Sequence, residues 1–177
     1  MIPLVKIGPG KKIPTEIDVV IEIPSHSDPI KYEVDKKTGV LRVDRFLATS
    51  MHYPCNYGYI PQTLSEDGDP VDVLVEAPFP LLSGCVILCR PIGMLEMEDE
   101  AGIDVKIMAV PVVEVSTFYI KVNTWEDLPP EVTGRIEHFF QHYKDLEKNK
   151  MVIVKGWKGV EAAKKEIQKS LDRYKKK

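Results

Sequence analysis

The 177-residue chain is predicted to adopt an α+β fold, with many short strands first and two helices after them. Two observations predict this order. Short runs that are apolar or alternate in polarity, bounded by proline and glycine, fill the first two-thirds of the chain and are typical of strands. Two longer segments in the last third carry apolar residues at helical spacing.

The predicted strands are rich in β-branched residues. Residues 18–23 alternate in polarity, and the runs 30–34 and 40–46 flank a polar loop at 35–39, which is typical of a hairpin. Further strands are expected at 71–76, 85–89 and 105–115, with a late return to the sheet at 151–156.

The two helices are predicted from apolar stripes. After Pro129 and Pro130, apolar residues recur at i, i+4, i+7, i+8 and i+11, from Val132 to Tyr143. A second stripe runs from Val160 to Tyr174. The favoured architecture is a small OB-like antiparallel β-barrel flanked by two helices. The length suits one hydrophobic core, so residues 1–177 are expected to form a single domain.

Composition excludes several classes of protein. A net charge of -3 argues against a nucleic-acid-binding protein that relies on a basic face. No apolar run approaches the roughly 18–20 residues of a membrane helix. Three cysteines, with no spacing typical of zinc sites, indicate a reducing compartment. We therefore expect a cytoplasmic protein with no membrane or nucleic-acid partner.

The densest cluster of charge lies at residues 67–72. Asp67, Asp69 and Asp72 repel one another over six positions, on a stretch shaped by Gly68 and Pro70. A bound hard cation with oxygen ligands, Mg²⁺ or Mn²⁺, would relieve this repulsion. A surface turn is the competing interpretation, because Asp, Gly and Pro are common turn formers. An EF-hand loop is excluded because its sixth position would be Asp72 rather than glycine.

Opposite charges also recur at two-residue spacing, which places them on one strand face. The pairs are Lys31 with Glu33, Arg42 with Asp44, and Asp104 with Lys106, while Glu22 interrupts an apolar strand. Each pair alone fits a solvated sheet face. Residues 67–72 and an acidic turn expected at 96–100 add further carboxylates. Together these charges predict a site in which carboxylates bind metal ions, while lysine and arginine side chains bind phosphate.

Residues 67–73, Asp-Gly-Asp-Pro-Val-Asp-Val, match the pattern D-[SGDN]-D-[PE]-hydrophobic-D-hydrophobic of family I soluble inorganic pyrophosphatases. Further segments resemble that family in its order along nearly the whole chain: 21–24, 28–33, 43–46, 53–60, 99–102 and 138–147. The chain is similar to the compact prokaryotic members. The resemblance implies Mg²⁺-dependent hydrolysis of inorganic diphosphate to two phosphates, by direct attack of a metal-activated water. It also implies two or more Mg²⁺ per subunit, with Mn²⁺ as a possible replacement.

The resemblance implies a role for each matched residue. Asp69 would be the general base toward the attacking water. The metal ligands would be Asp67, Asp72 and Asp104, with Asp99 for a metal that arrives with substrate and Glu22 for a further metal reached through water. Phosphate oxygens would be contacted by Lys31, Arg45, Tyr57, Lys106, Tyr143 and Lys144, with Glu33 and Glu100 in support.

The resemblance also implies a homohexamer. His138, His142 and Asp145 form a polar stripe at i, i+4 and i+7 on the first of the two predicted helices, the one after Pro130. A solvated helix face and a subunit contact both account for this stripe, so these three residues are possible interface residues.

Other functions stay open at this point. An OB-type nucleic-acid-binding module gains support from the lysine-rich end and from Tyr53, Tyr57 and Tyr59. A metal-dependent phosphohydrolase acting on a larger substrate lacks a visible glycine-rich nucleotide motif. A structural Mg²⁺- or Ca²⁺-binding protein would not need Asp69 or the separate cations.

Overall fold

The computed structural model describes residues 4–100 and 102–176, and it confirms the predicted α+β fold. The helices are α1 (Pro130–His142) and α2 (Val160–Lys175), with short 3-10 helices η1 (Leu4–Lys6) and η2 (Trp125–Asp127). The strands are β1 (Ile17–Ile23), β2 (Ile30–Val34), β3 (Leu41–Phe46), β4 (Asn56–Tyr59), β5 (Asp72–Val75), β6 (Val86–Asp99), β7 (Gly102–Pro111) and β8 (Val152–Lys158).

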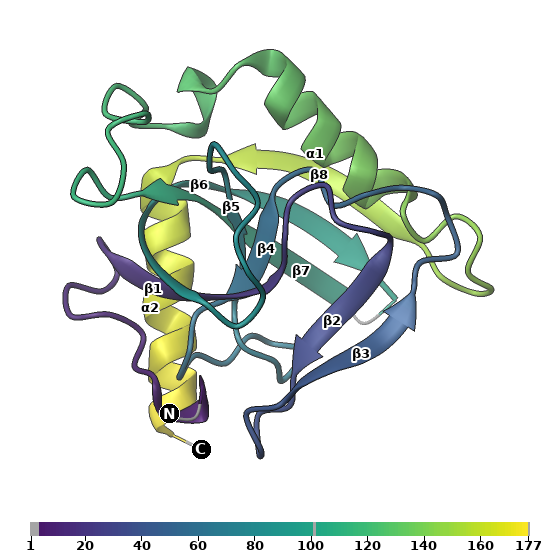
Figure 1. The fold of residues 1–177 in the computed structure, drawn as a ribbon, viewed down its shortest axis with the longest axis horizontal. Coiled ribbons are helices and arrows are strands. Elements are labelled where there is room, and N and C mark those ends of the chain that lie inside the picture. Colours follow the sequence, from purple (N-terminus) through teal and green to yellow (C-terminus); the bar gives the residue numbers. More distant parts are fainter. Residues whose placement is uncertain (1–3, 101, 177) are drawn as a thin grey trace.

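Six strands form one sheet in the order β1-β4-β5-β7-β6-β8, and β1 also pairs with β6. The remaining two, β2 and β3, form a separate hairpin ribbon that lies in front of the sheet in Figure 1. The expectation of a purely antiparallel sheet was wrong at one pair, because β5 and β7 run parallel. After β5 the chain forms β6, which lies two strands away from β5 in the sheet. Strand β7 follows and lies between β5 and β6.

Strand β6 is the largest departure from the predicted elements. It runs from Val86 to Asp99, well beyond the predicted 85–89, and takes in the acidic segment expected to be a turn. This segment stays extended because β8 pairs along it, with Met97 opposite Val154, and because Met97 is fully buried. Strand β4 was not predicted, and β7 begins and ends earlier than the predicted 105–115.

The predicted apolar stripes of both helices face the core. In α1, Ile136, Phe139 and Phe140 are buried in one hydrophobic cluster, and in α2, Ala163 and Ile167 are buried in another. Figure 1 shows the two helices against different parts of the sheet, with α1 beside β8. Neither these helices nor any other within residues 4–100 and 102–176 is long and apolar enough to cross a membrane.

Candidate active site

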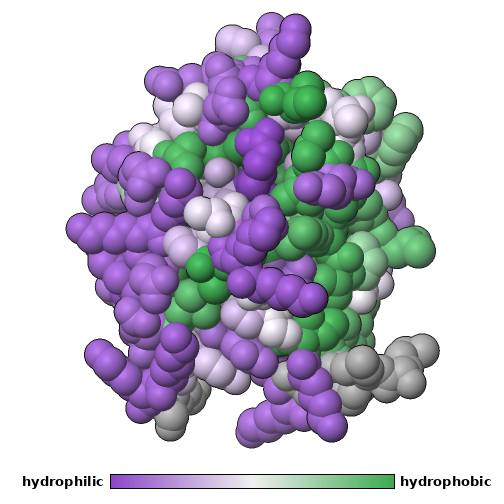
Figure 2. Space-filling view, turned by 90° about the vertical axis from the view of Figure 1, so that its left-hand side faces the viewer, coloured by the Kyte–Doolittle hydropathy of each residue, from purple (hydrophilic) through white to green (hydrophobic). Residues whose placement is uncertain are grey.

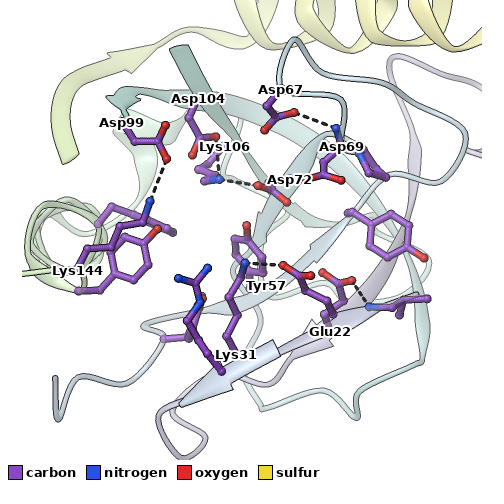
Figure 3. Close-up of a pocket in the computed structure, with 18 of the residues that line it drawn as sticks. Glu22, Lys31, Tyr57, Asp67, Asp69, Asp72, Asp99, Asp104, Lys106 and Lys144 are labelled. Carbon is purple, nitrogen blue, oxygen red and sulfur yellow. Dashed lines mark hydrogen bonds and ion pairs between the residues drawn. The ribbon is translucent and has the colours of Figure 1, made fainter. Parts of the chain in front are cut away.

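A pocket of ≈ 390 Å³ opens between the β2–β3 ribbon, the start of β5 and the adjoining part of β7 (Figure 3). Every residue that the sequence assigned to catalysis, metal binding, substrate binding or support lines it. These residues are Glu22, Lys31, Glu33, Arg45, Tyr57, Asp67, Asp69, Asp72, Asp99, Glu100, Asp104, Lys106, Tyr143 and Lys144. They come from strands, loops and the end of α1, so folding alone brings them together.

The aspartate segment is both a turn and a wall of the pocket. Gly68 has a φ of 93°, a backbone conformation that glycine adopts without strain. The Asp67 carboxylate accepts a hydrogen bond of 3.0 Å from the backbone N–H of Asp69, which closes the turn. Burial, together with the negative charges of Asp69 and Asp72, raises the pKa of Asp67. The turn interpretation and the site interpretation of this segment are therefore compatible.

Lys106 lies at the centre of the carboxylates. Its Nζ is 2.5 Å from Asp72 Oδ2 and 2.8 Å from Asp104 Oδ1 (Figure 3). The parallel pairing produces this contact, because Asp72 and Lys106 are register partners and Asp104 shares a strand face with Lys106. Burial alone would lower the pKa of Lys106, but the two carboxylates outweigh it and raise that pKa well above its usual value. Lys106 is thus an ammonium ion buried as a counter-charge.

The ribbon presents two cations side by side. Lys31 on β2 and Arg45 on β3 are register partners, an arrangement of like charges that is destabilising by itself. Carboxylates offset the repulsion: Lys31 Nζ is 2.5 Å from Glu33 Oε1, and Arg45 Nε is 2.9 Å from Asp44 Oδ2. Burial would lower the Lys31 pKa, but the carboxylates of Glu33 and Asp44 raise it overall. Both cations therefore stay charged beside the pocket.

Two further residues reach the pocket from the end of α1. The helix ends at His142, and Tyr143 then packs its ring on that of Phe139 with 5.2 Å between centroids. Burial raises the pKa of the Tyr143 hydroxyl. The Nζ of Lys144 is 2.9 Å from Asp99 Oδ2 and 3.7 Å from Glu100 Oε2, which ties this end of the helix to the end of β6. Glu100 also forms an ion pair with Lys150.

Glu22 is the most deeply buried carboxylate of the site, with 3% of its surface exposed. It accepts a hydrogen bond of 2.7 Å from the backbone N–H of Val34 and one of 3.0 Å from Lys36 Nζ. Burial raises the pKa of Glu22, and the nearby ammonium of Lys36 opposes that rise. Glu22, the polar residue that interrupts the apolar run of β1, therefore joins β1 to the β2–β3 ribbon.

The donor set suits a hard divalent cation. Asp67, Asp72 and Asp104 line one pocket and offer only carboxylate oxygens, which Mg²⁺ and Mn²⁺ prefer. Within residues 4–100 and 102–176, no three carboxylate, imidazole or thiol groups converge closely enough to ligate one ion as they stand. The ammonium of Lys106 forms ion pairs with two of these carboxylates, Asp72 and Asp104, and a divalent cation at the same oxygens would compete with it.

Sequence reasoning missed several residues that line the pocket. Lys36, Lys150 and Asp35 lie in connecting segments, where no spacing signal distinguished them from other surface charges. Tyr53 and Tyr59 were named in support of a nucleic-acid-binding module, and both are buried residues that line the pocket. Their alternation with Tyr57 along the chain was a signal that could have assigned all three to one wall.

The polar stripe of α1 lies outside this pocket. His142 Nδ1 is 2.8 Å from Asp145 Oδ2, and the rings of His138 and His142 are 4.7 Å apart. The two histidines line a separate shallow depression with Glu137 and Lys155. The stripe thus forms a contiguous polar surface that contributes nothing to the candidate active site.

Three comparisons with known proteins agree. The family model described as inorganic pyrophosphatase matches residues 19–175. The inorganic pyrophosphatase of Escherichia coli K12 is 57% identical over 174 residues, covering 98% of this chain and 99% of that protein. The chain also resembles the solved structure of an inorganic pyrophosphatase from Coxiella burnetii, with a TM-score of 0.92, 49% identity and coverage of 95% and 99%. A similar enzyme structure, from Thermus thermophilus, gives a TM-score of 0.91, 41% identity and coverage of 98% and 99%.

Proposed function

Because this chain belongs to the inorganic pyrophosphatase family and hydrolyses pyrophosphate with a divalent metal cofactor, we propose that the pocket behind the β2–β3 ribbon is its active site. The observation that carries the proposal is the convergence of carboxylates and cations from distant parts of the chain. Asp67, Asp72 and Asp104 supply negative charge there, opposite Lys31 on the ribbon (Figure 3). Arg45, the register partner of Lys31, lines the same pocket. A metal-bound polyanion needs both sets of groups.

We assign the metal sites to the carboxylates. Asp67, Asp72 and Asp104 would hold two or more Mg²⁺, or Mn²⁺ in their place, and Asp99 would hold an ion that enters with substrate. Glu22 would hold a further ion through water. When bound, these ions offset the negative charge of the substrate and lower the pKa of water. The all-oxygen donor set and the convergence of these carboxylates on one pocket support this assignment.

Six residues are assigned to the phosphate oxygens. Lys31 and Arg45 offset charge from the ribbon side, and Lys144 and Tyr143 do so from the end of α1. Tyr57 and Lys106 complete the set from the sheet, and Lys106 must exchange one carboxylate contact for a phosphate oxygen. Glu33 orients Lys31, and Glu100 orients Lys144; the ion pairs at 2.5 and 3.7 Å support these roles.

Asp69 is the proposed general base. Among the ion pairs between described residues none involves Asp69, so its carboxylate remains available to accept a proton. The oxygen of a water molecule attacks one phosphorus in line, and its proton passes to Asp69. The bond between that phosphorus and the bridging oxygen breaks, and its electron pair leaves with the second phosphate. No covalent bond between enzyme and phosphate is required.

Phosphate release from pyrophosphate tests this proposal. We expect activity with Mg²⁺, loss of activity with a chelator, and a fall in kcat of at least about 10²-fold for Asp69→Asn, the scale of a general base. The matched control is Asp172→Asn, the same change at an exposed position of α2. Turnover by Asp69→Asn at the level of the control would remove Asp69 from its role.

We further propose an OB-like barrel as the architecture of the sheet and a single domain over residues 1–177. The pairings support the barrel, because they lead from β1 through β4, β5, β7 and β6 back to β1. A cytoplasmic location is proposed with them. The free cysteines Cys55, Cys85 and Cys89 suit a reducing compartment.

A homohexamer is the proposed assembly. The loop after β7, at the left of Figure 1, exposes large apolar side chains, including Phe118 at 75% exposure. Figure 2 views the molecule from that side and shows hydrophobic side chains gathered over one half of the face. Exposed apolar surface of this kind marks interaction sites. His138, His142 and Asp145 are proposed as interface residues on a second face.

Sedimentation at pH 8 and pH 5 tests the assembly. Histidine is the side chain that gains charge over this range, so a histidine-lined contact should weaken at pH 5. We expect a hexamer at pH 8 and smaller species at pH 5. Equal sedimentation of hexamers at both pH values would remove the histidines from the interface, and a monomer at pH 8 would refute the hexamer.

A further inference from the structure

The β2–β3 ribbon carries Lys31 and Arg45, yet no backbone ladder joins it to the main sheet. Among the described strands, β2 and β3 pair only with each other. The positions of the two cations relative to the aspartates across the pocket therefore depend on side-chain contacts between the ribbon and the sheet. Because Lys31 and Arg45 are the phosphate-binding cations proposed for the ribbon, these contacts matter to how tightly substrate is bound.

One end of the ribbon is fastened by packing and by an ion pair. Leu47, directly after β3, is buried in the cluster that contains Phe139, and Tyr32 packs against the same cluster. Arg45 Nη1 is 3.0 Å from Glu147 Oε2. These contacts secure the base of the hairpin and leave its opposite end, at residues 34–41, to be held by other groups.

The opposite end is held by a compact set of contacts to β1 and β4. Val34 is buried against Val20 and Tyr59, and its backbone N–H donates to Glu22 Oε1. Lys36 lies just beyond the strand, in the hairpin loop. Its Nζ is 3.0 Å from the same Glu22 oxygen and 3.6 Å from the centroid of the Tyr59 ring. Figure 3 marks the interaction of Glu22 on the side of the pocket away from Lys144.

The Lys36 ammonium therefore contacts two groups of the sheet, the Glu22 carboxylate and the Tyr59 ring. It meets a carboxylate with 5% side-chain exposure and an aromatic face at close range, and both contacts are strengthened by partial removal from water. Without Lys36, the buried Glu22 carboxylate would keep one backbone hydrogen bond and lose its charged partner. The hairpin end would then keep only the Val34 hydrogen bond of its two polar contacts with Glu22.

We propose that Lys36 is a positioning residue, which fastens the hairpin end of the ribbon to β1 and β4 through Glu22 and Tyr59 and so holds Lys31 and Arg45 against the substrate. The inference rests on the proposed role of Lys31 and Arg45 in binding phosphate. Lys36 itself acts through the ribbon, since its ammonium is already occupied by Glu22 and Tyr59.

The test compares Lys36→Met with Lys37→Met. Both variants lose one lysine from the same hairpin loop, but Lys37 is exposed and none of the ion pairs between described residues includes it, so it is a matched control. Hydrogen–deuterium exchange of backbone amides is measured by mass spectrometry over residues 30–46 and, for reference, over β7. Steady-state kinetics with pyrophosphate and saturating Mg²⁺ give KM and kcat separately.

In Lys36→Met we expect amides of the ribbon to exchange about tenfold faster while those of β7 keep their wild-type rate. KM should rise about tenfold with kcat within about twofold, because the loosened ribbon binds substrate and transition state equally less well. Lys37→Met should match the wild type in both measurements. Lys36→Arg, which can keep the ion pair and the ring contact, should restore both.

Two results would overturn the proposal. A raised KM with wild-type exchange in the ribbon would mean that Lys36 contacts substrate directly. Faster exchange with an unchanged KM would mean that the attachment has no bearing on substrate binding. Lys31→Met tests the underlying role separately: a wild-type KM there would refute the proposed phosphate contact while the exchange measurement still reports on the Lys36 attachment.

Discussion

Lys106→Met removes a buried ammonium from between two carboxylates and keeps most of the side-chain volume. Lys106 is 5% exposed, and its Nζ lies 2.5 Å from Asp72 and 2.8 Å from Asp104. In the absence of metal, the variant must keep both aspartates charged without their partner or protonate them. Breaking a buried ion pair by removal of one partner costs about 3–5 kcal/mol. The side chain of Asp72 is 25% exposed, so we expect a loss near the lower end, about 3 kcal/mol.

Divalent cations should reverse part of this loss. In the wild type, Mg²⁺ must compete with the Lys106 ammonium for Asp72 and Asp104. In the variant, no ammonium at position 106 competes for these two carboxylates. A ligand at 100 times its Kd stabilises the folded state by about 2.7 kcal/mol, and tighter binding adds to this. Saturating Mg²⁺ should therefore raise the unfolding free energy of Lys106→Met by more than it raises that of the wild type.

Urea unfolding at one protein concentration, with chelator and then with Mg²⁺, measures both effects. The fluorescence of Trp125 and Trp157, which stack with 5.4 Å between ring centroids, reports the transition. Lys155→Met is the matched control, because Lys155 pairs with Glu98 on the surface with both side chains 42% exposed. That change should leave the unfolding free energy close to that of the wild type, because exposed ion pairs contribute little. Two results would refute the reasoning. One is that, without metal, Lys106→Met loses as little unfolding free energy as the control, and the other is that Mg²⁺ stabilises the variant and the wild type equally.

Two further predictions concern stability. A Cβ at Gly58 would lie 2.0 Å from the backbone oxygen of Val20, so Gly58→Ala should cost about 3 kcal/mol or prevent folding, whereas Gly134→Ala in α1 meets nothing within 4 Å and should stabilise by about 0.5–1 kcal/mol. Thermal unfolding of the pair decides this, and similar shifts in both variants would contradict it. Burial and the carboxylate of Glu76 raise the pKa of Tyr119 to about 12 from its usual 10.0. A raised pKa means that the neutral hydroxyl contributes stability below pH 10, and that this contribution is lost as pH rises toward 12. The stability difference between wild type and Tyr119→Phe should therefore shrink over that range in urea titrations, and a constant difference would count against it.

Local sequence patterns determined the elements whose partners lie close in the chain. The hairpin of β2 and β3 was predicted almost to its ends, because alternating strands on either side of residues 35–39 need only each other. Both helices were predicted from stripes that the core then buries. The aspartates at 67–72 predicted by their mutual repulsion that a cation binds near them, and this prediction needed no knowledge of what surrounds the segment.

Tertiary structure decided the rest. The pairing of β8 turned an acidic run into the second half of β6, and the parallel pairing of β5 with β7 placed Lys106 between Asp72 and Asp104. Asp99 meets Lys144 across 45 residues of chain. Periodicity along a sequence fixes which face a side chain occupies, but it carries no information about which distant strand will lie beside that face. Burial, altered pKa and the fastening of the ribbon all depend on that neighbour, and so they exist only once the chain has folded.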